Sequence, residues 1–111
     1  MNYNNRKFSA VSNSNNGEVS NGMIFHYEQV GNIVTCTYSG PDIKTGHLIG
    51  LVDENGCIQM KYHQVNKHGE LMTGSCSSKP EKMKNGKIRL HESWQWTSGD
   101  RSKGYSILEE I

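Results

Sequence analysis

The ten residues KIRLHESWQW, Lys87 to Trp96, decide the fold class. Every second position faces one way, and this set is Ile88, Leu90, Glu92, Trp94 and Trp96. The intervening positions are polar or charged from Lys87 to Gln95. A two-residue period held over ten residues indicates a β-strand with one apolar and one solvated face. The stretch therefore predicts a sheet that covers a core on one side only.

Turn signals recur on both sides of this strand. They are Asn15-Asn16-Gly17, Gly31-Asn32, Ser39-Gly40-Pro41-Asp42, Glu54-Asn55-Gly56, Lys67-His68-Gly69, Lys84-Asn85-Gly86 and Ser98-Gly99-Asp100. Asn-Gly favours tight hairpins because their central residues need positive φ angles. These breaks leave eight strand-like segments, at 7–13, 23–30, 32–38, 43–53, 57–63, 70–78, 87–96 and 103–110. No segment shows a convincing helical period, although 79–84 has room for one helical turn.

Eight strands joined by short turns predict an up-and-down antiparallel order. An open sheet of this length would expose two edges, and closure into a barrel removes them. We therefore expect an all-β, closed, up-and-down antiparallel barrel of about eight strands forming one domain over residues 1–111, with residues 1–5 frayed. A two-layer β-sandwich is the alternative.

Composition narrows the function classes. The chain has 12 basic and 11 acidic residues and a net charge of +1, which predicts neither a nucleic-acid nor a membrane partner. No secretory signal is visible after Met1, so we expect a cytoplasmic protein. Cys36, Cys57 and Cys76 are odd in number and widely spaced, which favours free, buried thiols. No residues at metal-ligand spacing occur, and neither a metal nor another cofactor is expected.

Following the apolar register of each segment predicts the residues inside the barrel. They are Phe8, Ala10, Ser12, Phe25, Tyr27, Gln29, Val34, Cys36, Tyr38, Leu48, Gly50, Ile58, Met60, Tyr62, Thr73, Ile88, Leu90, Glu92, Trp94, Trp96, Tyr105 and Ile107. Glu92 is the exception in this set, because a buried carboxylate is costly unless it is paired or protonated. It is either a ligand-orienting or acid–base group, or a structural carboxylate bonded to a tyrosine or to Arg6.

Six further residues complete the predicted ligand site around Glu92. They are Trp94, Trp96, Tyr38, Tyr62, Tyr27 and Ser12. Aromatic rings can stack on a flat ligand that satisfies their polar edges, or they can simply fill the barrel. Ser12 could bond the polar end of a ligand, or belong to an ordinary polar turn.

Several motifs resemble a known group of proteins. Phe25–Gln29, Gly46–Gly50, Thr73–Ser78 and especially His91–Asp100 are similar to those of small uncharacterised bacterial proteins, often labelled N-acetylglutamate synthase. The coenzyme A loop of such an acetyltransferase is poorly matched by Arg101–Ser106, which lacks the last glycine or alanine and the helix that must follow. That activity is therefore not expected. The strand order also resembles avidin-type and lipocalin-type barrels, although the lipocalin Gly-x-Trp is absent.

Three functions follow from these observations. The first is a non-enzymatic barrel that binds a small, partly aromatic or amphipathic ligand in a pocket of about 300 Å³ or more. The second is an enzyme that uses Glu92 as general acid or base with a tyrosine partner. The third is a structural or interaction barrel whose apolar outer patch would bind a second subunit in a homo-oligomer. Its apolar outer residues would be Ile24, Ile33, Ile49, Leu51, Val65 and Leu108.

Overall fold

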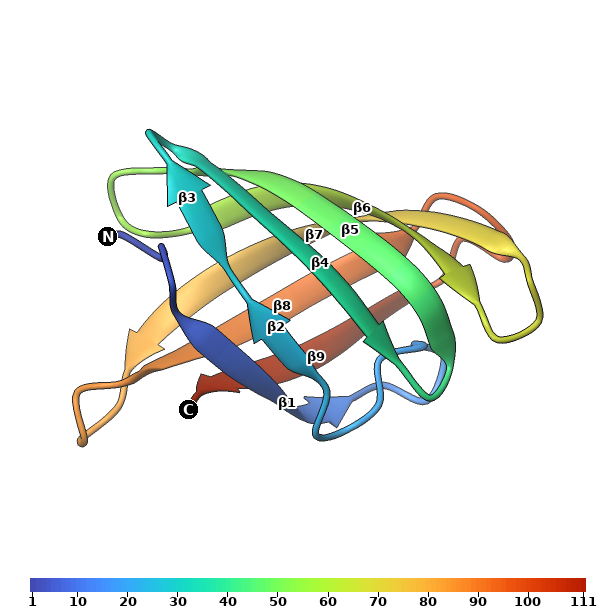
Figure 1. Ribbon diagram of the computed structural model, residues 1–111, viewed down its shortest axis with the longest axis horizontal. Helices are drawn as coiled ribbons and strands as arrows, with labels where there is room; N and C mark the ends of the chain where they lie inside the picture. The colour runs from blue at the N-terminus through green and yellow to red at the C-terminus, as the bar shows by residue number, and fades with distance from the viewer.

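The computed structural model describes residues 1–111 and consists of nine β-strands without a helix (Figure 1). The strands are β1 (Lys7–Asn13), β2 (Ile24–His26), β3 (Glu28–Val30), β4 (Ile33–Gly40), β5 (Ile43–Val52), β6 (Ile58–Asn66), β7 (Leu71–Lys82), β8 (Ile88–Trp96) and β9 (Lys103–Glu110). The structure contains no helix long and apolar enough to span a membrane. Segment 79–84, which had room for a helical turn, instead extends β7 to Lys82.

All strand pairs are antiparallel, and the sheet order is β2-β1-β9-β8-β7-β6-β5-β4-β3. The predicted segment 23–30 forms both edges of this sheet, because β2 pairs with β1 whereas β3 pairs with β4. Tyr27 lies between β2 and β3. Its carbonyl accepts a hydrogen bond from the Asn5 N–H, and its own N–H donates to the Arg6 carbonyl. The sheet therefore curls into a nearly closed barrel, as predicted, with one interrupted strand at the seam.

Six of the seven predicted turns join successive strands. Gly56 and Gly86, for example, have φ angles of 82° and 84°, which glycine adopts without strain. The Asn15–Gly17 signal is the exception, because no tight hairpin forms there. The chain between β1 and β2 instead runs through an irregular loop, residues 14–23, which we call the lid loop.

The predicted register of β8 is confirmed. Ile88, Leu90, Trp94 and Trp96 are buried in a core of 20 hydrophobic residues. Glu92 faces the same interior, while the alternate residues of this strand face outward. Barrel closure thus places the one carboxyl of this stripe inside the molecule.

Four residues predicted to face inward do not, and the lining of the barrel explains three of them. On β9 the inward residues are Gly104, Ser106 and Leu108, so Tyr105 is 71% exposed and Ile107 only half-buried. Gly104 lies under the Trp94 ring, where any Cβ atom would collide with the indole. Gly74 on β7 lies in the same way against the Tyr62 ring, which turns Thr73 outward. Small residues thus face inward opposite the large rings.

The fourth error, Ser12, has a different cause. The pairing of β1 with β9 shifts by one residue between Ala10 and Ser12, which marks a β-bulge. Because a bulge adds one residue to one strand, the side chains beyond it change faces. Ser12 is therefore exposed, and Asn13 points into the barrel in its place.

The two ends of the barrel are closed differently. At the end that holds both chain termini, Tyr3 is fully buried, packs against Phe8 and Tyr27, and donates a hydrogen bond to the Gly56 carbonyl (Figure 1). Residues 1–5, expected to fray, thus contain a core residue. The lid loop lies at the opposite end, beside the β4–β5, β6–β7 and β8–β9 connections.

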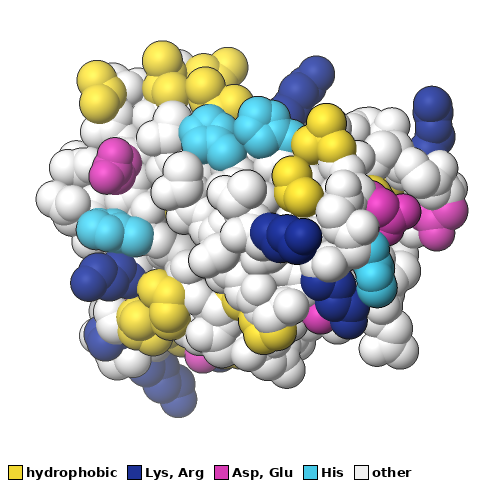
Figure 2. Space-filling model, turned by 45° about the vertical axis from the view of Figure 1, so that its right-hand side comes forward, with side chains coloured by type: hydrophobic (Ala, Val, Ile, Leu, Met, Phe, Trp, Pro, Cys, Tyr) yellow, Lys and Arg dark blue, Asp and Glu magenta, His cyan; other side chains and the backbone are white.

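On the outer surface, basic, acidic and apolar side chains are interspersed over the face shown in Figure 2. Of the apolar residues predicted to face outward, Ile24, Ile33, Ile49 and Leu51 are exposed. Leu108 is 2% exposed and belongs to the core, which corrects its assignment.

Candidate functional site

An interior cavity of about 60 Å³ lies at the lid-loop end of the barrel. Six of the seven predicted site residues line it, and these are Glu92, Trp94, Trp96, Tyr38, Tyr62 and Tyr27. Only Ser12 lies outside, because of the bulge in β1. The cavity is smaller than the 300 Å³ expected from the sequence, and it holds only a few atoms with the lid loop in place.

Aromatic rings form one wall of the cavity. The Trp94 and Trp96 ring centroids lie 5.6 Å apart in an edge-to-face arrangement, and the Tyr62 ring lies 5.8 Å from Trp96. Such geometry is favourable for aromatic pairs. The Trp94 indole N–H donates to Asn13 Oδ1, and the Trp96 indole N–H donates to the Asn16 carbonyl. The protein, rather than a ligand, therefore satisfies the polar edges of both tryptophans, and only their faces and carbon edges remain for a ligand.

Side-chain hydrogen bonds hold the lid loop over the cavity. The carboxylate of Glu18 accepts a bond from Gln64 Nε2 and one from Asn66 Nδ2, both at 2.8 Å. Gln64 Oε1 in turn accepts a bond from the Tyr38 hydroxyl, also at 2.8 Å. Because Gln64 and Asn66 are both only 3% exposed, these bonds are shielded from water.

Apolar packing fixes the lid loop as well. Val19 packs against the core, and Gly17 lies so close to Trp94 that an added Cβ atom would lie 2.9 Å from ring carbon Cζ2. A ligand larger than the cavity therefore requires part of the lining to move, and the lid loop is the part that is not held in a β-strand. The lid loop is thus part of the lining, and its position limits the room in the cavity.

Sequence reasoning missed Glu18, Gln64 and Asn66. Two of them continue a visible pattern, because Ile58, Met60, Tyr62, Gln64 and Asn66 alternate in one register. The sequence predicts a strand that ends at residue 63, and the polar inward end of β6 lies beyond that boundary. Nothing in the sequence signals Glu18, whose role depends on how the lid loop folds back.

Glu92 lies between two serine hydroxyls on neighbouring strands. Ser106 Oγ on β9 donates to Glu92 Oε1 at 3.1 Å. Ser78 on β7 is paired with Glu92 across the sheet, and its hydroxyl is buried near the carboxyl without reaching hydrogen-bonding geometry. Arg6, a partner proposed from the sequence, pairs with Glu110 instead. Glu92 therefore has no cationic partner.

The surroundings of Glu92 change its acidity. The carboxyl is enclosed by protein and lines the cavity. Desolvation raises its pKa to about 7, against a smaller lowering by the Ser106 and Ser78 hydroxyls. Glu92 therefore changes charge near neutral pH.

The hydroxyl of Tyr27 is the second unusual polar group. Tyr27 is fully buried and lines the cavity, yet its hydroxyl has no hydrogen-bond partner in the protein. Burial, followed by the nearby charge of Glu92, raises its pKa well above the ordinary value, so it stays a neutral donor. A buried hydroxyl without a partner is costly, which makes it available to a molecule in the cavity.

The three cysteines are free, as predicted. Cys36 and Cys76 are buried in the core. Cys57 is half-buried and follows Gly56, at the end of the barrel that Tyr3 fills. Burial raises the pKa of Cys36 to about 12 and that of Cys76 further still. Cys76 lines the cavity, but as a neutral thiol it is a poor nucleophile.

Comparison with known proteins agrees with this architecture. A family model described as Avidin-like protein matches residues 1–111. No curated protein and no solved structure matches the chain. The family match covers the entire sequence, and the barrel is all-β, antiparallel and nearly closed. The chain therefore belongs to the Avidin-like protein family.

Proposed function

We propose that the barrel binds a small, partly aromatic or amphipathic molecule in its interior, without chemical conversion. The main support is a cavity in which aromatic surface adjoins two polar groups that the fold leaves under-used, Glu92 and the Tyr27 hydroxyl. A core selected only for stability gains nothing from such groups. The ligand would lie against the Trp96 and Tyr62 rings, with its polar end toward Glu92.

The lid loop would control entry. Its polar contacts to Gln64 and Asn66 come from one residue, Glu18, whereas Asn16 fixes the start of the loop to Trp96 and β9. The part of the loop around Glu18 would therefore move when the two Glu18 bonds break. Movement would also withdraw Val19 and enlarge the space beside the tryptophans. We therefore expect a ligand larger than the present cavity to bind with the lid loop displaced.

Binding can be followed through tryptophan emission, because the chain has only two tryptophans and both line the cavity. We expect a single-ring probe, chosen from benzylamine, benzyl alcohol and benzoate, to change the emission saturably with one molecule bound per chain. Cys76→Met adds two carbon atoms at the cavity wall and should weaken this binding strongly. Cys57→Met makes the same change outside the cavity and should leave binding unaffected. Equal binding by both variants would contradict an interior site.

The lid loop gives a separate prediction. Glu18→Ala removes both acceptors of the Gln64 and Asn66 amides, so the loop should open more often. Acrylamide quenching of the tryptophan emission should then increase several-fold over the wild type. Glu54→Ala, in an exposed turn at the other end, is the control and should quench like the wild type. Unchanged quenching in Glu18→Ala would show that its hydrogen bonds do not hold the loop.

One observation favours a second function, general acid–base catalysis by Glu92. A pKa of about 7 suits a group that must both take and give a proton at neutral pH. The two functions differ in what happens to the bound molecule. Mass spectrometry of a molecule that co-purifies with the protein, before and after incubation with fresh protein, separates them. Recovery of the unchanged molecule supports binding, and conversion that Glu92→Gln abolishes supports catalysis.

A further inference from the structure

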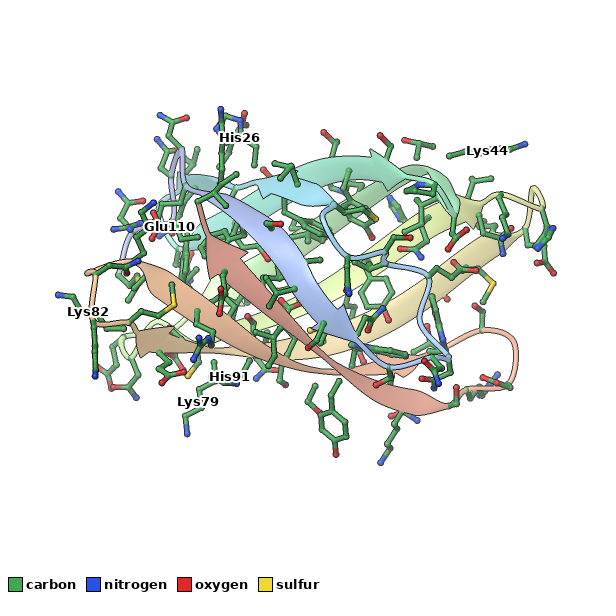
Figure 3. The ribbon with its side chains drawn as sticks, turned by 90° about the horizontal axis from the view of Figure 1, so that it is seen from below. His26, Lys44, Lys79, Lys82, His91 and Glu110 are labelled. Carbon is green, nitrogen blue, oxygen red and sulfur yellow. The ribbon has the colours of Figure 1, made fainter.

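The charges around the cavity have one sign. Glu92 and Glu18 both line it, whereas no lysine, arginine or histidine does. The ion pairs of the protein lie elsewhere, at Arg6–Glu110, Lys67–Asp42, Arg89–Glu81, Arg89–Glu109 and His91–Glu81. Lys44, Lys79, Lys82 and His91 carry their side chains on the outside of the barrel (Figure 3). No cationic group of the protein therefore reaches the interior carboxylates.

The two carboxylates are not equivalent. Glu18 is used by the fold, because each of its oxygens accepts an amide hydrogen bond. Glu92 accepts only the bond from Ser106, although an ionised carboxylate offers about four acceptor sites. The cavity thus contains one carboxylate with spare acceptor capacity, and it is the natural partner of a single positive charge.

The aromatic wall favours the same kind of ligand. Ring faces carry negative potential and attract organic cations, most strongly when water is excluded. Trp94, Trp96 and Tyr62 place three such rings around the cavity that Glu92 borders. An anionic group would instead meet a carboxylate and ring faces in an environment of low dielectric constant, which is unfavourable.

From these contacts we infer that the ligand is a small organic monocation, with an ammonium or amidinium head bound by Glu92 and an apolar or aromatic body against the tryptophans. This inference rests on the proposed function and narrows it to one ligand class. The Tyr27 hydroxyl, a neutral group, completes the site by donating to Glu92 or by accepting from the head of the ligand.

Three probes of nearly equal shape test the ligand class. Benzylamine, benzyl alcohol and benzoate share one ring and differ in charge, being positive, neutral and negative near neutral pH. Titration of the wild type near pH 8 should show benzylamine binding at least about tenfold more tightly than benzyl alcohol, with benzoate weakest. In Glu92→Gln this preference should fall to about twofold or less, while Glu54→Gln, the matched exposed change, should keep it.

The pH dependence gives a readout that needs no variant. Affinity for benzylamine should fall about tenfold from pH 8 to pH 6 as Glu92 becomes protonated, whereas affinity for benzyl alcohol should stay constant. The other titratable groups near Glu92 lie on three other strands and at the seam; they are Cys36 and Tyr38 on β4, Tyr62 on β6, Cys76 on β7 and Tyr27 at the seam. Burial raises the pKa of each well above this range, so they stay neutral. Glu18, in the lid loop, is the remaining charged group in the lining.

The outcomes separate this inference from the function on which it rests. If none of the three probes binds, the binding function fails, and the cation proposal fails with it. If benzyl alcohol or benzoate binds the wild type as tightly as benzylamine does, the binding function stands and the cation proposal is overturned. A benzylamine preference that survives in Glu92→Gln, or that does not change from pH 8 to pH 6, would also overturn it.

Discussion

Replacing Trp94 with alanine is expected to lower the free energy of unfolding by about 3–5 kcal/mol. The ring is buried, packs edge-to-face on Trp96 and fills the space above Gly104. Its loss would also leave Asn13 Oδ1 without its indole donor. Since a domain of this size has a total stability of about 5–15 kcal/mol, the variant should melt at a much lower urea concentration or fail to fold.

Tyr105→Ala is the matched control for Trp94→Ala. Tyr105 lies next to Gly104 and is paired with Ser93, but its ring is on the outer face and 71% exposed. Its removal should change the free energy of unfolding by no more than about 0.5 kcal/mol. A large loss in Tyr105→Ala, with a small one in Trp94→Ala, would mean that β9 and β8 face the other way. Urea melts of the two variants therefore test the register directly.

This register also shows how far the sequence determines the fold. In β8 the alternation of apolar and polar residues is unambiguous, so its inward face was predicted correctly. In β9 both faces carry apolar residues, and hydrophobicity alone favoured Tyr105 and Ile107. The deciding factor is the volume of Trp94, which requires glycine opposite it. Such a constraint links residues of different strands and becomes readable only once the strand pairing is known.

The candidate site was predictable to the same extent. Residues on well-alternating strands, such as Trp96, Tyr62 and Glu92, were placed correctly in the interior. Ser12 was misplaced because no local pattern signals the bulge that precedes it. Glu18 was missed because irregular loops have no periodicity. The strands thus predict the walls of the cavity, whereas the bulge and the lid loop determine its size and its closure.

The charge of Glu92 should make the ligand-free protein less stable as pH rises. The folded state raises the pKa of this carboxyl to about 7, above the value of 4.5 for a solvated glutamate, so between these values the folded state binds more protons than the unfolded state. The contribution of this group to the free energy of unfolding is therefore completely present below pH 4.5 and is lost as the pH rises through 7. The difference between the folded and the unfolded pKa of Glu92 corresponds to about 3 kcal/mol of unfolding free energy.

Glu92→Gln removes this charge and keeps the shape of the side chain. Near pH 8 the variant should be more stable than the wild type by about 3 kcal/mol. Near pH 5, where both side chains are neutral in the folded state, the difference should shrink to about 1 kcal/mol or less. Urea melts of both proteins at the two pH values provide the measurement, with Glu54→Gln as the control for an exposed charge. If Glu92 serves to bind a ligand, the variant should be stabilised, because the ionised carboxylate destabilises the protein until a ligand neutralises it. A variant less stable than the wild type near pH 8 would instead mean that ionised Glu92 already has a stabilising partner in the fold, and the carboxyl would then belong to the scaffold.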